Sequence, residues 1–366
     1  MRYFYKLGNL VFEIVGSGFF VDKIRDEFVS IKISEFQEPQ LVYVFKDKIE
    51  KNNYRNTGRL YCKDDSILIE NGFFVYSVSI GKSSTQVEIE SGIKKDNSPL
   101  RKVFQRFANF NYLTLCETQV KNFVYNIFDW TSQIAGLGIN QTYIHASTIE
   151  KNDNGIAFFA WGGVGKTALL SHLCMNSGFK FLSDDLGVLD SEGFIYLNPK
   201  KIQIYGYNVL NDRGLFRKVF ANRGKVDFLN WFLFNKLRGP KRARRRVSPG
   251  ILFEFSKKEK VTLETVFFLE KVSGSEMKIS KLAYEVAARR MSSIVMSEIE
   301  PFSSLEREAE AGGFNFVASS VKVKKSIESV ISRTVISNCF LVVIGESVPH
   351  HRFIEFMQGT IEDLGY

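Results

Sequence analysis

Several features that are common in proteins are scarce or missing in this chain of 366 residues. It has only four cysteines, Cys62, Cys116, Cys174 and Cys339, and they lie far apart with no paired spacing. Neither a disulfide framework nor a zinc knuckle is therefore expected, and a reducing compartment is indicated. No apolar run approaches the roughly 20 residues that a bilayer span requires, and Glu13 interrupts the stretch where a signal peptide carries its apolar core. We expect a cytoplasmic protein with no membrane partner.

Low-complexity segments and internal repeats are also missing. The chain is 45% apolar and 24% charged, values that exclude a wholly disordered or fibrous protein. At roughly 150 residues per domain, the length corresponds to two or three domains.

Acidic residues are nearly absent from one segment. The net charge is +9, and the segment Arg213–Arg246 holds twelve Lys or Arg but a single acid, Asp227. The interruption by Gly239 and Pro240 predicts a basic loop at about residues 236–246. Three interpretations stay open: a solvated loop, a clamp for an acidic or phosphorylated ligand, and a nucleic-acid contact, which is the least favoured.

Short alternating apolar runs occupy the N-terminal part of the chain. Leu41–Phe45 and Ser66–Glu70 are examples, and the turn Asn71–Gly72 follows the second run. This pattern is typical of antiparallel strands. The polar stretch Ile93–Pro99 fits a connection. The sequence thus predicts a β-rich N-terminal module over residues 1–99 and an α/β domain over residues 100–366.

The second part alternates between predicted helices and strands. Apolar residues recur at helical spacing from Val120 to Ile134, and this helix stops at Gly136 or Gly138. The elements expected next are strands at 142–149 and 156–160, a helix from 168 to about 178, a strand at 179–183, a strand at 261–269, a helix at 283–295, a strand at 340–344 and a helix at 351–364.

A glycine-rich segment between a predicted strand and a predicted helix carries the strongest chemical signal. It reads Ala160-Trp161-Gly162-Gly163-Val164-Gly165-Lys166-Thr167. Glycines let successive backbone N–H groups point at a polyphosphate, and the following helix adds the partial positive charge of its N-terminus. In such a loop Lys166 neutralises the β and γ phosphates and Thr167 supplies a hydroxyl to Mg²⁺. Trp161 is expected to pack over the first helical turn, with stacking on a base as the alternative. A guanine-specificity element of the Asn-Lys-x-Asp type is missing, which disfavours a GTPase.

Two adjacent carboxylates follow one helix and one strand later. Asp184 and Asp185 end the run Phe181-Leu182-Ser183, so they are expected at the strand tip, where ligands of α/β sheets bind. Neighbouring residues of a strand point to opposite faces, so one carboxylate would hold the metal and the other would accept the proton of an attacking hydroxyl. His145 is expected on the strand before the one that leads into the loop; taken alone, a histidine there fits the core as well as a catalytic site.

Together these motifs resemble the catalytic core of the HPr kinase/phosphorylase family, which has a phosphoenolpyruvate-carboxykinase-like nucleotide-binding fold. The segments that carry the resemblance are His145-Ala146-Ser147, Gly162-Gly163-Val164-Gly165-Lys166-Thr167 and Leu182-Ser183-Asp184-Asp185. The resemblance covers about residues 123–207 and is closest to HPr-kinase-related proteins with a β-rich N-terminal region. It implies ATP and Mg²⁺ as ligands, Asp185 as the proton acceptor, Thr167 at the metal, and His145 and Lys166 as further active-site residues. Asp184, the other carboxylate of the pair, is then expected to support the metal.

The chain departs from that family at three points. Ala160 stands where the phosphate-binding loop pattern begins with glycine, which is a mild change because both residues are small. The interval from the loop to the aspartates is one residue longer. Gln203 falls on the position of a metal-binding Glu, and a neutral amide is a poorer Mg²⁺ ligand. HPr as the substrate and the reverse phosphorolysis are therefore both in question.

The function expected from the sequence is an ATP- and Mg²⁺-dependent kinase that transfers the γ-phosphoryl group to a hydroxyl, with a serine of a protein or peptide as the favoured acceptor. A small-molecule kinase and a non-catalytic ATP-binding sensor or scaffold remain alternatives. The sequence leaves the oligomeric state open.

Overall fold

The computed structural model describes residues 1–366 apart from residues 53, 59, 64–65, 82, 91–114, 211, 222 and 315–318. The expected connection Ile93–Pro99, with the module boundary after residue 99, lies outside the described residues. The protein is mixed α/β as predicted: it is 39% helix and 32% strand, so neither type dominates. None of the helices in the described part is long and apolar enough to cross a bilayer.

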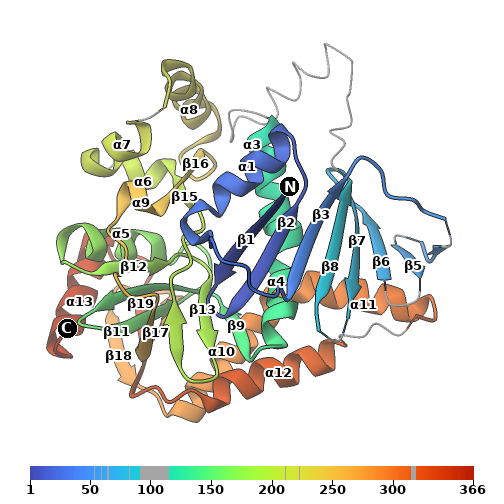
Figure 1. The fold of residues 1–366 in the computed structure, drawn as a ribbon. Helices are drawn as coiled ribbons and strands as arrows, with labels where there is room; N and C mark the ends of the chain where they lie inside the picture. The colour runs from blue at the N-terminus through green and yellow to red at the C-terminus, as the bar shows by residue number, and fades with distance from the viewer. Residues whose placement is uncertain are drawn as a thin grey trace. The chain divides into compact units, whose positions relative to one another are not determined.

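The chain forms two compact units, each built from separate stretches of sequence (Figure 1). Unit 1 comprises Met1–Gly136, Lys201–Ile251 and Glu300–Lys322. Unit 2 comprises Leu137–Lys200, Leu252–Ile299 and Val323–Tyr366. The basic segment therefore belongs to unit 1, together with the N-terminal strands, and the glycine loop belongs to unit 2.

Unit 1 contains an eight-stranded sheet with the order β1-β2-β3-β8-β7-β6-β5-β4. Its strands are β1 (Arg2–Leu7), β2 (Leu10–Val15), β3 (Leu41–Lys46), β4 (Arg55–Asn56), β5 (Leu60–Lys63), β6 (Ser66–Glu70), β7 (Val75–Ile80) and β8 (Thr85–Glu90). Most neighbours are antiparallel as predicted, but β3 runs parallel to both β2 and β8. A parallel pair needs a long crossover, which α1 (Phe19–Glu27) and the 3₁₀-helix η1 (Val29–Ile31) provide between β2 and β3.

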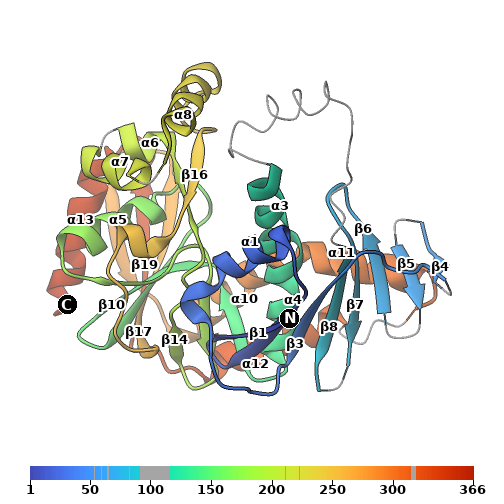
Figure 2. The ribbon, with the colours of Figure 1, turned by 45° about the horizontal axis from the view of Figure 1, so that its top comes forward.

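A continuous helical run packs on this sheet. It consists of α3 (Leu115–Phe123), the π-helical η2 (Val124–Phe128) and α4 (Asp129–Leu137), which confirms the helix predicted to stop near Gly136. The ring of Phe128 lies 5.1 Å from that of Phe12, and the hydroxyls of Tyr43 and Thr131 lie 2.7 Å apart. Figure 2 shows α3 beside α1 and α11 (Glu300–Ala311) alongside β5.

The basic segment Arg213–Arg246 contains only part of the loop that was predicted at about residues 236–246: residues 239–243 connect a helix to a strand, whereas residues 236–238 are helical and residues 244–246 lie on a strand. It forms α7 (Arg213–Phe220), α8 (Lys225–Arg238) and β16 (Arg244–Val247); α6 (Gly206–Leu210) precedes it and α9 (Pro249–Leu252) follows. β16 pairs antiparallel with β15 (Ile202–Tyr205). The solvated interpretation does not hold for Arg245 and Arg246, which are buried at 2% and 9% exposure through ion pairs with carboxylates that composition alone could not locate.

The strands of unit 2 form one connected sheet in which β17 is central. Its strands are β9 (Gln141–Ile144), β10 (Ala146–Lys151), β11 (Asn154–Phe159), β12 (Lys180–Ser183), β13 (Gly187–Asp190), β14 (Phe194–Tyr196), β17 (Lys260–Val272), β18 (Met277–Lys281) and β19 (Asn338–Gly345). β11, β17 and β19 are parallel neighbours, and the glycine loop leaves the C-terminal end of β11. The helices are α5 (Lys166–Asn176), α10 (Tyr284–Glu298), α12 (Ser320–Arg333) and α13 (His350–Asp363).

The predicted elements of unit 2 are present, with one exception. The strand expected over residues 142–149 is two strands, β9 and β10, which are separated by His145 alone. β9 pairs with β13, whereas β10 pairs with β11 and β12. These strands stand near opposite ends of the strand order, so the sheet curls until its ends meet at His145.

Candidate functional site

The predicted site residues of unit 2 lie where two antiparallel chain segments run side by side, between the two ends of the curled sheet. One segment runs from β9 through His145 into β10, and the other runs antiparallel to it from β12 through the aspartates into β13. Thr148 pairs with Ser183 and Ile144 pairs with Gly187, so these two pairs share one register across a three-residue interruption, and the β10–β12 register shifts only beyond Thr148. His145, Asp184 and Asp185 lie outside the strands, so their side chains are available for chemistry.

The glycine loop leads from β11 to α5 with the conformation that its glycines were predicted to allow. Gly163 and Gly165 have φ angles of +86° and +114°. Gly165 is the N-cap of α5 and no side chain caps this helix end, so its first N–H groups face outward as they do in anion sites. Ala160 has no positive φ, which explains why a residue with a Cβ is tolerated at the first position of the loop.

Lys166 closes the loop on itself. Its ammonium group donates to the carbonyl oxygen of Ala160 at 2.7 Å, and the side chain is buried. Burial lowers the pKa of Lys166, while the charges of Asp185, Asp184 and Glu298 act in the opposite direction. The lysine is thus held at the loop by backbone geometry and by nearby carboxylates.

Asp184 lies beside the loop and not on the far side of the sheet. Thr167 donates from its hydroxyl to the two carboxylate oxygens of Asp184 at 3.4 and 3.2 Å, and Ser147 donates to Oδ1 at 2.7 Å. Asp184 is buried, and desolvation together with the charge of Asp185 raises its pKa to about 7. A carboxylate in this position lacks a positive partner of sufficient strength, which is the condition that a metal cation would relieve.

Asp185 occupies a strained turn. Its φ angle is +63°, and the N–H of Leu186 donates to the carbonyl of Asp184 at 2.8 Å, so Asp185 is the central residue of a γ-turn. A positive φ at a residue other than glycine costs free energy and is concentrated at functional sites. The turn separates the two carboxylates: Asp184 is buried and Asp185 is only half-buried.

His145 stands opposite the aspartates, next to a residue that the sequence did not reveal. Its Nδ1 lies 3.5 Å from the Glu298 carboxylate at the end of α10. Burial and the charge of Lys166 lower the pKa of His145 against the opposing effects of Glu298 and Asp185, so the imidazole is neutral at pH 7. No motif surrounds Glu298, and only the packing of α10 near β9 brings it to the site.

Trp161 and the C-terminal helix define the outer side of the loop. Trp161 is 55% exposed, which favours the alternative in which its ring stacks on a base over packing on the first helical turn. His350 begins α13, and a Cβ on Gly165 would come within 3.2 Å of its ring. The loop therefore has α13 directly behind its last glycine.

Gln203 belongs to unit 1, whereas the residues described above belong to unit 2. It lies on β15, where its amide donates to the hydroxyl of Tyr125 at 2.8 Å. Its match to a metal-binding Glu stays a prediction.

The residues present fit Mg²⁺ bound together with a nucleotide. No group of three or more His, Cys, Asp or Glu within the described ranges is placed to hold a metal alone. Mg²⁺ is commonly held by one or two protein oxygens, several waters and substrate phosphates. Asp184 and Thr167 supply that small number of oxygens beside the loop.

A scan against models of known protein families and a search of curated proteins return no match for this chain.

Proposed function

We propose that this protein is an ATP- and Mg²⁺-dependent kinase that transfers the γ-phosphoryl group of ATP to a hydroxyl, with a serine of a protein or peptide as the favoured acceptor. The core of unit 2 is then a phosphate-binding-loop kinase core of the HPr kinase type. One observation carries the proposal. Thr167, which follows Lys166 at the end of the glycine loop, donates a hydrogen bond from its hydroxyl to the buried carboxylate of Asp184.

The loop supplies the nucleotide site in this proposal. Uncapped N–H groups at the start of α5 and the charge of Lys166 take the place of water around the β and γ phosphates. The bond between Lys166 and the Ala160 carbonyl is exchanged for bonds to phosphate oxygens. Mg²⁺, when bound, neutralises charge on these oxygens, and Asp184 with Thr167 would hold it.

Asp185 is the proposed proton acceptor. It is half-buried next to Asp184, and its γ-turn fixes the direction of its side chain. The acceptor hydroxyl gives its proton to Asp185, its oxygen forms the new bond to the γ phosphorus, and the bond from that phosphorus to the β-phosphate oxygen breaks to release ADP.

His145 and Glu298 have a supporting role in this proposal. A neutral imidazole donates one hydrogen bond and accepts another, so it can orient either the acceptor or Asp185. Glu298, 3.5 Å from Nδ1, fixes which nitrogen of His145 carries the proton and is a positioning residue.

The experiment compares wild type with Asp185→Asn. Purified protein is incubated with γ-labelled ATP, Mg²⁺ and cell extract, and label is followed separately in macromolecules, in low-mass products and in released phosphate. We expect transfer by wild type and a loss of about a thousandfold in the variant, in the range of general-base catalysis.

Thermal unfolding in the presence of Mg-ATP separates binding from chemistry. Both proteins should be stabilised by the nucleotide, because Asp185 is not needed for binding. Nucleotide protection without product in any fraction would identify a non-catalytic ATP sensor, and label only in low-mass products would identify a small-molecule kinase. Equal turnover by the two proteins would remove Asp185 from the mechanism.

A further inference from the structure

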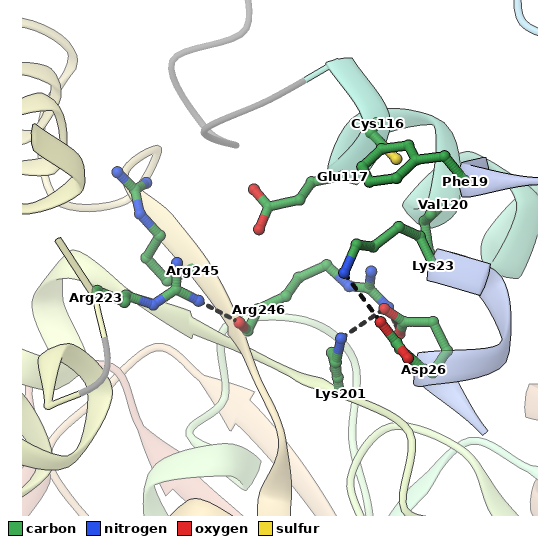
Figure 3. Close-up of a pocket in the computed structure, with 11 residues that line it drawn as sticks. Phe19, Lys23, Asp26, Cys116, Glu117, Val120, Lys201, Arg223, Arg245 and Arg246 are labelled. Atoms are coloured by element: carbon green, nitrogen blue, oxygen red, sulfur yellow. Dashed lines mark hydrogen bonds and ion pairs between the residues drawn. The ribbon is translucent and has the colours of Figure 1, made fainter. Parts of the chain in front are cut away.

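A cavity of about 320 Å³ lies within unit 1, and none of the residues assigned to the proposed kinase site lines it. Its lining comes from α1, α3, the start of β15 and the basic segment, and it consists of Phe19, Lys23, Asp26, Glu27, Cys116, Glu117, Val120, Lys201, Arg223, Arg245 and Arg246. Figure 3 shows Glu117 reaching from α3 and Arg246 from β16 into the same space. The volume is in the range of small-molecule sites.

The cavity is built from buried ion pairs in which each of two carboxylates serves two cations. Glu27 accepts from Arg246 at 2.8 Å and from Lys201 at 2.7 Å. Behind the lining, Asp227 accepts from Arg245 at 2.8 Å and from Arg223 at 2.7 Å. The side chains of Glu27 and Asp227 are only 7% and 2% exposed, so solvent screens these charges poorly.

The charges around the cavity do not balance. Five cations line it against the three carboxylates Asp26, Glu27 and Glu117, and Asp227 adds one more behind them. On α3, burial and then the charges of Arg244 and Arg246 lower the pKa of Lys121, so positive charge also acts on this helix. Among the described residues, five lining cations thus stand against four carboxylates.

Arg246 is the residue most directly affected by this imbalance. Its side chain is 7% exposed and spans the cavity, with one Nη bonded to Glu27. Its Nε is buried and has no hydrogen-bond partner within the described part of the chain. A buried donor and an excess of buried positive charge both cost free energy until an anion satisfies them.

We propose that this cavity binds a small ligand with a phosphate-like dianion, held by Arg246 and Lys201. Guanidinium groups match the geometry of tetrahedral oxyanions, and Arg246 offers the free Nε as well as charge. The rest of the ligand lies against the apolar wall of Phe19 and Val120. This site is separate from the proposed kinase activity and does not depend on it.

Cys116 provides a local reporter, because its thiol is partly accessible and lines the cavity. The full chain is treated with N-ethylmaleimide over a series of phosphate concentrations, at constant ionic strength kept with NaCl. Labelling is quantified on the Cys116 peptide by mass spectrometry, which separates it from the other three cysteines. Phosphoserine forms a parallel series and distinguishes a phosphorylated compound from free phosphate.

Two substitutions at one ion pair make the test independent of structural damage. Arg246→Gln should raise the phosphate concentration for half-protection about tenfold, the loss expected for a charge-assisted hydrogen bond. Glu27→Gln breaks the same pair but removes a competing negative charge, so it should lower that concentration. Arg238→Gln removes an exposed cation from the same unit and should change nothing. If Arg246→Gln does not fold, Lys201→Gln is used in its place, and it should also raise the phosphate concentration for half-protection.

The result expected is protection by phosphate in wild type and in Lys166→Met, with opposite shifts in Arg246→Gln and Glu27→Gln. Tighter protection by phosphoserine would assign a phosphorylated compound as the ligand. Protection equal to that of NaCl, or shifts of Arg246→Gln and Glu27→Gln in the same direction, would overturn the proposal.

Discussion

Two groups of buried charges in this chain are unbalanced in opposite directions. In unit 2, Lys166 faces the carboxylates of Asp184, Asp185 and Glu298. In unit 1, Glu27 and Asp227 are each shared by two cations. The first group lacks positive charge and the second lacks negative charge. The sign of each deficit underlies the two proposals: a metal cation for unit 2 and an anion for unit 1.

The comparison matters because buried charge is expensive unless it is paired. A buried carboxylate with a purely structural role finds its hydrogen-bond partners within the chain. Asp190 is an example, because its carboxylate accepts from two backbone N–H groups and the hydroxyl of Tyr196. Charge left unmatched in two places points to ligands.

The largest expected effect is on the stability of unit 1. Asp227→Asn leaves Arg245 and Arg223 buried without their shared carboxylate, and it should destabilise the protein by about 3–5 kcal/mol. Chemical denaturation measures this change. Asp212→Asn is the matched control, because Asp212 caps α7 and asparagine caps equally well; it should cost less than about 0.5 kcal/mol. Equal effects of the two substitutions would show that the ion pairs of Asp227 have no special weight.

The second effect concerns the loop of unit 2. Gly165→Ala forces a side chain into a φ of +114° and against the ring of His350, so nucleotide affinity should fall about thirtyfold or more. Gly162→Ala is the control: a Cβ there meets nothing within 4 Å and the φ is not positive, so affinity should hardly change. Titration with a fluorescent ATP analogue compares them, and similar losses in both would contradict the loop geometry.

The third effect is smaller and has the opposite sign to that of Asp227→Asn. Folding raises the pKa of Asp184 from 3.8 to about 7, so the folded protein favours its protonated form. The stability that this provides is present below about pH 4 and is lost as the pH rises towards 7. Asp184→Asn does not titrate, so without metal it should stabilise the protein by on the order of 2 kcal/mol at pH 8 and by much less at pH 4.

Thermal unfolding over this pH range, in the presence of EDTA, measures the effect. Asp190→Asn serves as the control in the same unit. Both carboxylate oxygens of Asp190 accept hydrogen bonds, and the single oxygen of an amide cannot accept in place of both, so that variant should be destabilised. An Asp184→Asn variant that is destabilised at pH 8 would mean that unit 2 has no deficit of positive charge.

Sequence reasoning located the parts of the site that are contiguous in the chain. The loop Ala160–Thr167 and the pair Asp184–Asp185 are local patterns whose chemistry depends on a strand, a turn and a helix in succession. The helices and strands of unit 2 were predicted for the same reason, since their apolar periodicity is local.

The sequence could not provide the contacts between distant segments. Glu298 reaches His145 only through the packing of α10, and Arg246 is buried only because Glu27 of α1 meets it. The break at His145 escaped prediction because the apolar pattern continues through it, while the hydrogen-bond partners change from β13 to β11 and β12. From composition alone a basic segment is expected to be exposed to solvent. Only the three-dimensional structure locates the carboxylates that pair with it and allow it to be buried.

The shared register on either side of the aspartates has an evolutionary consequence. An insertion of one residue between Ser183 and Gly187 would shift the β13–β9 pairs against the Thr148–Ser183 pair and turn the side chains that follow to the opposite face of the sheet. Length changes are therefore tolerated upstream, where α5 ends at Asn176 and Gly178 follows with a φ of +75°, and not between the aspartates and β13. In related chains the number of residues between Lys166 and Asp184 should vary. The number between Asp185 and the start of β13 should stay constant.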